Sequence, residues 1–153
     1  MAEIIDKIDL KILRILQSDS SRSLDSISNE VGVSLNTCWR RISRLEKNSI
    51  IEGRVALIDN EKIGLPLTVF VFISTDNHSK EWTQMLSNAV VSINEIVEFY
   101  RLTGNTDYIL KMMVRDVDHY DSVYKQLIKL VKISDVSASF AMEKIKFTTE
   151  LPI

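Results

Sequence analysis

Residues 24–47 read LDSISNEVGVSLNTCWRRISRLEK, and this stretch decides the fold of the first part of the chain. A first apolar stripe recurs with helical spacing at Leu24, Ile27 and Val31. Gly32 then suits a left-handed turn position, and Ser34 suits the N-cap of a following helix. Two short helices joined by a tight turn predict a helix-turn-helix.

The second of these helices should expose a face that can read DNA. Its inward stripe is expected at Cys38, Ile42 and Leu45. The polar and basic residues left outside are the expected DNA-binding residues: Ser34, Asn36, Thr37, Arg40, Arg41, Arg44 and Lys47. Arginine pairs with guanine and asparagine with adenine, while a helix N-terminus can hold a phosphate. The alternative is that the arginines only solvate an exposed helix.

Two neighbouring features complete the expected DNA-binding domain, residues 1–60. Upstream, Ile5, Ile8, Ile12 and Leu16 predict one further amphipathic helix. Downstream, Arg54–Ile58 predicts a linker strand, with Gly53-Arg54 as the tip of a wing that contacts phosphate. Trp39 could either pack beside the turn or lie against the DNA backbone, and we expect it to pack.

From Ile50 onward the hydrophobic period changes from helical to strand-like. The expected elements are strands at 67–74, 96–103, 107–115 and 136–147, with helices at 79–93 and 118–131. This β-α-β-β-α-β order predicts a ferredoxin-like domain over residues 61–153. The fold class is therefore α+β, with an N-terminal winged helix-turn-helix.

The strand at 67–74 is apolar on both faces, with Val69 and Val71 on one and Phe70 and Phe72 on the other. Two helices can cover only one face of a four-stranded sheet, and soluble monomers avoid a large exposed apolar patch. We therefore expect a homodimer, which would present two reading helices to a pseudo-palindromic duplex. The last strand changes phase after Met142, which suggests that it leaves its own core.

Composition points to a cytoplasmic protein without membrane association. The 153 residues carry a net charge of −2 and one cysteine, Cys38, with no apolar run long enough to span a bilayer. The start of the chain lacks the pattern of a signal peptide. His78 and His119 have no catalytic or metal-binding residues at motif spacing, so we expect no catalytic site, metal or cofactor.

Several motifs together resemble the Lrp/AsnC, or feast/famine, family of transcriptional regulators. They are Ile8-Asp9, Val31-Gly32-Val33-Ser34, Cys38-Trp39-Arg40-Arg41-Ile42, Ile50-Ile51-Glu52-Gly53, Thr103-Gly104, Asp107-Tyr108-Ile109-Leu110-Lys111 and Thr148-Thr149-Glu150-Leu151-Pro152. The resemblance covers essentially the whole chain, and the two halves agree in order and spacing.

This resemblance implies an amino-acid effector and higher assembly of the dimers, often to octamers. Taken alone, the glycine loop 103–107 is only a hairpin turn. The family places an effector site there, at the interface between dimers, so that Gly104 admits a carboxylate to backbone N–H groups and Asp107 accepts from an ammonium. The residues at the matching positions are Leu102, Thr103, Gly104, Asn105, Thr106, Asp107, Ser139 and Phe140.

Two other binding functions stay open at this point. An RNA-recognition module shares the sheet order but needs exposed aromatic residues on its central strands, for which Phe99, Tyr100 and Tyr108 are the candidates. An architectural, chromatin-like DNA-binding protein would use the same helix-turn-helix without an effector. Only ligand binding separates this second alternative from a regulator.

Overall fold

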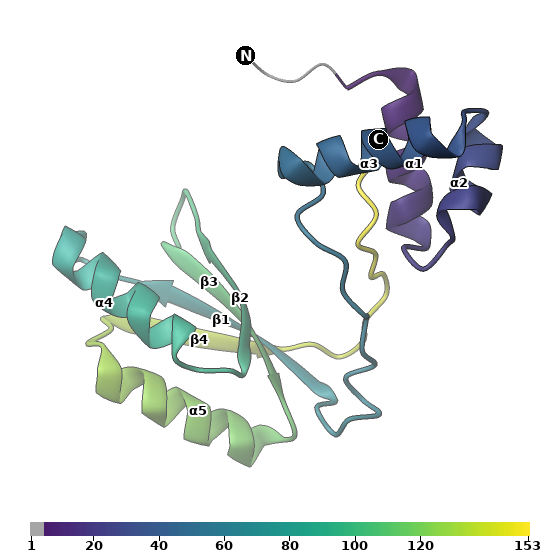
Figure 1. The fold of residues 1–153 in the computed structure, drawn as a ribbon. Coiled ribbons are helices and arrows are strands. Elements are labelled where there is room, and N and C mark those ends of the chain that lie inside the picture. Colours follow the sequence, from purple (N-terminus) through teal and green to yellow (C-terminus); the bar gives the residue numbers. More distant parts are fainter. Residues whose placement is uncertain (1–4) are drawn as a thin grey trace. The chain divides into compact units, whose positions relative to one another are not determined.

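The computed structural model describes residues 5–153, and the chain forms two compact units (Figure 1). The first comprises Met1–Leu57 together with Lys146–Ile153, and the second comprises Ile58–Ile145. The domain boundary expected near residue 60 lies close to this division. The second domain was expected to run to residue 153, whereas Lys146–Ile153 belong to the first unit. No helix in the described part of the chain is long and apolar enough to cross a membrane.

The first unit is built from helices α1 (Lys7–Ser18), α2 (Leu24–Val31) and α3 (Leu35–Lys47). Each begins at a side-chain cap: Asp6, Ser23 and Ser34 accept hydrogen bonds from backbone N–H groups of the first turn. The three apolar stripes meet in one core, formed by Ile12, Leu13, Leu16, Ile27, Val31, Cys38, Ile42 and Leu45. The predicted three-helix arrangement is therefore confirmed.

The segment after the second unit returns to helix α1 and contributes to the first unit. The Gln17 side-chain amide donates to the Leu151 carbonyl and accepts from the Leu151 N–H, at 3.3 and 2.7 Å. Arg14 Nε donates to the Ile153 carbonyl at 2.6 Å. These bonds, made beside α1 by the yellow segment of Figure 1, explain why residues 146–153 belong to the first unit.

The expected linker strand at Arg54–Ile58 does not form, and the described connection between α3 and β1 (Leu67–Ser74) contains no strand. A strand needs a hydrogen-bonded neighbour, and among residues 5–153 no strand pairs with this segment. Its apolar side chains are consequently exposed, with Val55 at 78%. The wing expected at Gly53-Arg54 is absent from the described residues for the same reason.

The second unit has the predicted β-α-β-β-α-β order. After β1 come α4 (Lys80–Val91), β2 (Ile96–Arg101), β3 (Tyr108–Val114), α5 (Val117–Leu130) and β4 (Asp135–Phe140). The sheet order is β2-β3-β1-β4 with antiparallel pairs throughout. The last strand stops at Phe140 rather than at residue 147, so the phase change after Met142 marks chain that has left the sheet.

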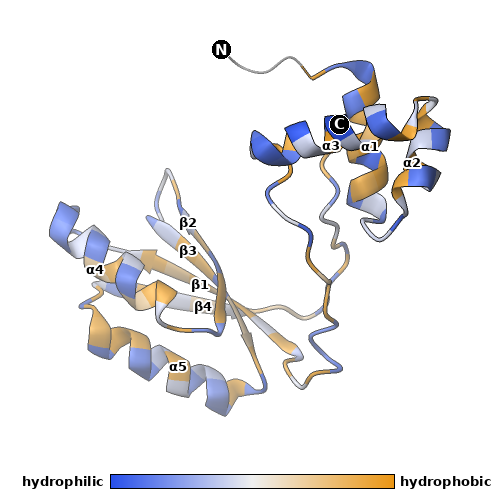
Figure 2. Ribbon diagram, in the orientation of Figure 1, coloured by the Kyte–Doolittle hydropathy of each residue, from blue (hydrophilic) through white to orange (hydrophobic). Residues whose placement is uncertain are grey.

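One face of this sheet forms the core and the other does not. Val69, Val71 and Ile73 of β1 are buried beneath α4 and α5, whereas Phe70 and Phe72 are half-buried on the opposite face. Figure 2 shows apolar residues along the strands and on the two helices, which lie together on one side of the sheet in Figure 1. The predicted division of β1 into two apolar faces is confirmed.

Candidate nucleic-acid interface and effector site

Helices α2 and α3 are joined as the sequence predicts. Gly32 lies at φ 74° and ψ 40°, the left-handed conformation that glycine adopts without strain. Two residues later the Ser34 hydroxyl accepts from Thr37 N and donates to Thr37 Oγ1. This turn fixes where α3 begins, and therefore which of its residues face outward.

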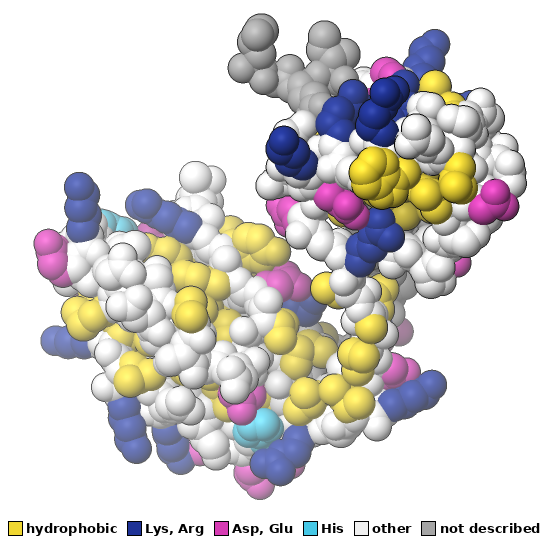
Figure 3. Space-filling model, in the orientation of Figure 1, with side chains coloured by type: hydrophobic (Ala, Val, Ile, Leu, Met, Phe, Trp, Pro, Cys, Tyr) yellow, Lys and Arg dark blue, Asp and Glu magenta, His cyan; other side chains and the backbone are white. Residues whose placement is uncertain are grey.

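The outward face of α3 carries most of the expected DNA-binding residues. Ser34, Asn36, Arg40 and Lys47 are exposed, and Thr37 is half-buried. Arg40, Arg41 and Arg44 line an open hollow of about 340 Å³. Figure 3 shows the basic side chains gathered over α3, and three guanidinium groups around one hollow suit the phosphates and the guanine edges of DNA.

The structure also shows how Arg41 and Arg44 are held, which the sequence analysis missed. Arg41 donates to Asp6 and Asp9 of the first helical turn, at 2.7 and 2.8 Å, and Arg44 donates to Asp9 at 2.6 Å. The Asp9 side chain is fully buried. Its position four residues before Leu13 on the α1 stripe was the available signal, since a carboxylate on a buried stripe requires a cationic partner.

These ion pairs shift the titration of the groups that make them. The pKa of the Asp6 carboxyl is lowered to about 2, first by the bond from the Asp9 N–H and then by the Arg41 guanidinium. The pKa of Arg41 is raised by its bonds to Asp6 and then to Asp9. Burial raises the pKa of the Cys38 thiol, so it packs as a neutral side chain.

An apolar patch lies beside the basic one. Trp39 is 58% exposed and Leu35, one turn earlier on α3, is 50% exposed, and Figure 3 shows hydrophobic surface next to the basic side chains. The expectation that Trp39 packs beside the turn is therefore wrong for this chain. Arg54, expected at a wing tip, instead pairs with Glu46 at 2.9 Å.

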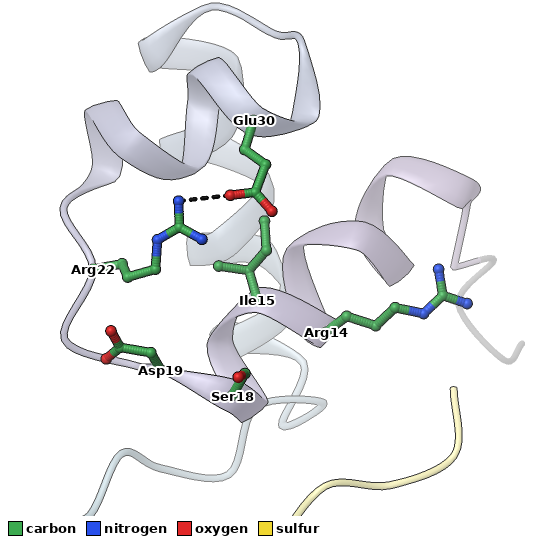
Figure 4. A pocket seen from close by; sticks show the side chains of 6 residues that line it. All are labelled: Arg14, Ile15, Ser18, Asp19, Arg22 and Glu30. Atoms are coloured by element: carbon green, nitrogen blue, oxygen red, sulfur yellow. Dashed lines mark ion pairs between the residues drawn. The ribbon is translucent and has the colours of Figure 1, made fainter.

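A second pocket of the first unit lies where α1 ends. It has a volume of about 250 Å³ and is lined by Arg14, Ile15, Ser18, Asp19, Arg22 and Glu30 (Figure 4). Its basic groups are already engaged: Arg22 pairs with Glu30 at 2.6 Å, and Arg14 bonds to the C-terminal segment. We assign no ligand to this pocket.

In the second unit, the glycine loop is tied to the end of β1. Gly104 has φ 117°, and residues 102–105 are exposed. The Asp107 N–H donates to the Ile73 carbonyl, and Asp107 Oδ2 accepts from the buried N–H of Thr75 at 2.8 Å. The carboxylate thus has one oxygen engaged in the fold, and its second oxygen could receive an ammonium group.

Ser139 and Phe140 lie away from this loop in the same chain. They pair with Phe70 and Val69 of β1, whereas Asp107 lies beside Ile73. From the usual strand dimensions, Ser139 lies about 10 Å from Asp107 along the strands and about 10 Å across them. Phe140 packs edge-on against Tyr120, while Ser139 points to the opposite face. A single amino acid cannot contact both groups within one chain.

The aromatic residues considered for RNA recognition do not form a platform. Phe99 and Tyr108 stack on each other at 5.4 Å between ring centres, and both pack into the core below the helices. Tyr100 is exposed on the edge strand β2. RNA-recognition modules need stacked aromatics on the uncovered face of the central strands. The placement of Phe99 and Tyr108 therefore disfavours this alternative.

Comparison with known proteins gives the same two domains. The model of the Lrp/AsnC ligand binding domain matches residues 68–151, and the winged helix-turn-helix DNA-binding model matches residues 5–52. The DNA-binding transcriptional activator DecR of Escherichia coli K12 is 46% identical, with 97% of this chain and 99% of DecR covered. The glutamate uptake regulatory protein of Zymomonas mobilis is 45% identical, with coverage of 97% and 91%.

Solved structures agree over nearly the whole chain. An AsnC family transcriptional regulator from Agrobacterium tumefaciens is 48% identical with a TM-score of 0.93, covering 96% of both chains. A transcriptional regulator from Neisseria meningitidis, solved in complex with L-Met, is 31% identical with a TM-score of 0.92 and 97% coverage of both. With a winged helix-turn-helix DNA-binding domain before an Lrp/AsnC ligand binding domain, this chain belongs to the Lrp/AsnC family of transcriptional regulators.

Proposed function

We propose that the chain binds a pseudo-palindromic DNA site through α3, and that a small amino acid controls this binding. One observation carries the DNA assignment: the exposed face of α3 combines Asn36 and Arg40 with the basic hollow formed by Arg40, Arg41 and Arg44. Asparagine and arginine are the side chains that read adenine and guanine in the major groove. We assign the chain a binding role in the cytoplasm and no reaction.

The DNA assignment is tested with Arg40→Ala. A good base contact contributes about 1–3 kcal/mol of discrimination, so affinity for a duplex selected by the wild type should fall roughly 5- to 150-fold. Lys11→Ala is the matched control, because it removes the same charge from an exposed position of α1. Equal losses in the two variants on the selected duplex would contradict base reading by Arg40.

We infer a homodimer that assembles further, because the uncovered face of the sheet carries half-buried apolar side chains. Phe70 and Phe72 of β1 lie on this face; Phe72 is opposite Ile109 of β3, and Phe70 is opposite Lys111, which pairs with Glu98. A second copy, sheet against sheet, would bury them and bring two α3 helices to a symmetric site. Higher rings, up to an octamer, are the assembly that the family favours.

Light scattering of Phe72→Asp tests this assembly. The wild type should be a dimer or an even multiple at micromolar concentration, and Phe72→Asp should shift it towards the monomer because the interface would contain an unpaired charge. Met142→Asp is the control, since Met142 is 96% exposed and outside the sheet. A monomeric wild type would overturn the inference.

The effector is proposed to be a free amino acid, bound near Gly104 and Asp107. The second oxygen of Asp107 can accept from the ammonium, and the loop offers backbone N–H groups to the carboxylate. Ser139 and Phe140 would then contribute from a neighbouring subunit, because they are too far away within one chain. The L-Met complex of the Neisseria relative supports a small amino acid as the ligand class.

Control of DNA binding would arise by linkage. A ligand bound between subunits favours one assembly by as much as its affinities for the two assemblies differ. Calorimetric titration with each amino acid, followed by DNA binding with and without the ligand, tests this proposal. If no amino acid binds at millimolar concentration, the architectural alternative without an effector replaces it.

A further inference from the structure

Asp9 is a fully buried carboxylate that belongs to α1 but binds the arginines of α3. Oδ1 accepts from Arg41 Nη1 at 2.8 Å and Oδ2 accepts from Arg44 Nη2 at 2.6 Å. Oδ2 also accepts from the Asp6 backbone N–H at 3.1 Å, which closes the capping box of α1. A single side chain thus joins the start of one helix to two turns of the other.

The arrangement leaves the arginines anchored yet accessible. The side chain of Arg41 is 21% exposed and that of Arg44 is 40% exposed, although their shared partner Asp9 is at 0%. Each guanidinium is therefore bonded to the carboxylate on one side and reaches solvent on the other. Both also line the open hollow beside Arg40.

Such anchoring matters because arginine side chains are flexible. Ordering one rotamer-rich side chain at an interface costs about 0.5–1.5 kcal/mol. A guanidinium already held in place avoids much of this cost, and it keeps its solvent-facing edge in one direction. Asp9 and Asp6 also offset the charge of Arg41 and Arg44, so the gain from this network is geometric rather than a stronger attraction for DNA.

We propose that Asp9 is a positioning residue for DNA recognition, which holds Arg41 and Arg44 in their DNA-binding orientation before DNA arrives. This inference rests on the proposed function of α3. A positioning role differs from that of an ion pair that only stabilises the fold, because the specificity of the protein for one DNA sequence should then depend on Asp9. Among the arginines that line the hollow, Arg41 and Arg44 are bonded to Asp6 and Asp9, whereas Arg40 is not, so Arg40 would contact DNA without this support.

Asp9→Asn separates positioning from charge. The substitution makes the surface more positive, so electrostatics alone would strengthen binding to every duplex. Positioning predicts the opposite for specificity: the ratio of affinities for the selected duplex and a scrambled duplex should fall at least tenfold. Asp25→Asn is the matched control, because it removes the same charge from an exposed position of α2 and should leave the ratio unchanged.

Arg41→Lys provides a second variant, in case Asp9→Asn does not fold. It keeps the charge, but an ammonium cannot bridge Asp6 and Asp9 and also face the DNA as a guanidinium does. We expect the same direction of change in the affinity ratio, with thermal melts confirming that the protein is folded. A ratio within twofold of the wild type in the folded Asp9→Asn and Arg41→Lys variants would overturn the positioning role.

A measurement without DNA distinguishes a failure of the positioning role from a failure of the proposed DNA-binding function. Guanidinium NMR signals of Arg41 and Arg44 should be sharp and restrained in the DNA-free wild type, and averaged in Asp9→Asn. Averaged signals in the wild type would overturn the inference even if DNA binds. A wild type that selects no duplex would overturn the proposed function, and restrained signals would then indicate a purely structural clamp.

Discussion

Asp107 makes one structural hydrogen bond and is proposed to make a second contact, with the effector; two substitutions distinguish these two roles. One carboxylate oxygen accepts from the buried N–H of Thr75 at 2.8 Å, which ties the glycine loop to the end of β1. The other is proposed to receive the effector ammonium. Asp107→Ala removes both interactions, whereas Asp107→Asn keeps an oxygen for Thr75 and removes only the charge.

The two variants should differ in stability and agree in effector binding. Leaving the Thr75 N–H without an acceptor costs about 1–3 kcal/mol, so Asp107→Ala should lower the melting temperature of the second unit by roughly 5–20 °C. Asp107→Asn should melt close to the wild type. If the ammonium binds there, both variants lose a charge-assisted bond of about 1.5–3 kcal/mol, which should weaken amino-acid binding roughly 10- to 150-fold.

Calorimetry with the best-binding amino acid and thermal melts of all three proteins provide the assay. Binding to Asp107→Asn with wild-type affinity would show that the ammonium does not lie at Asp107. Equal melting of Asp107→Ala and the wild type would show that the bond to Thr75 contributes little to the fold. Either result alone identifies which of the two roles fails.

Three further predictions concern the first unit. Lys47→Ala should weaken binding to all sequences about equally and lower the salt slope of binding by about one, as removal of a phosphate contact does, which titrations at several salt concentrations will show. Ser49→Gly should raise the free energy of unfolding by up to about 1 kcal/mol in denaturant titrations, because Ser49 has φ 55°, where glycine is favoured; no change would exclude strain there. The lowered pKa of Asp6 contributes stability that is fully present above its ordinary pKa of 3.8 and is lost as the pH falls through about 2. Over this pH interval the Asp6→Asn variant should therefore lose less stability than the wild type in acid unfolding titrations. Parallel curves for the two proteins would contradict this prediction.

Local sequence patterns were enough to predict the elements and their order. Helix α3 has the predicted inward stripe of Cys38, Ile42 and Leu45, and β1 occupies the predicted residues 67–74. Both depend on periodicity and on capping residues, which act within a few residues along the chain. The α+β class and the β-α-β-β-α-β order follow from the same information.

Features that need a distant partner were not predictable from such patterns. The strand expected at 54–58 has the right composition, but no strand in the described part of the chain pairs with it. The pairing of Asp9 with Arg41 and Arg44, and the docking of residues 146–153 on α1, join segments that lie far apart in the sequence. The distance between Ser139 and the glycine loop also could not be predicted locally. It depends on the order of the strands in the sheet, which places β4 and β3 on opposite sides of β1.

The most direct test of the account is the anisotropy titration of a duplex, selected from a random library by the wild type, with and without saturating amino acid. We predict binding of the selected duplex at least a hundredfold tighter than of a scrambled one, with a midpoint that one amino acid shifts at least fivefold. Equal affinity for the two duplexes would contradict sequence-specific recognition by α3. Specific binding that no amino acid shifts would contradict control by an effector.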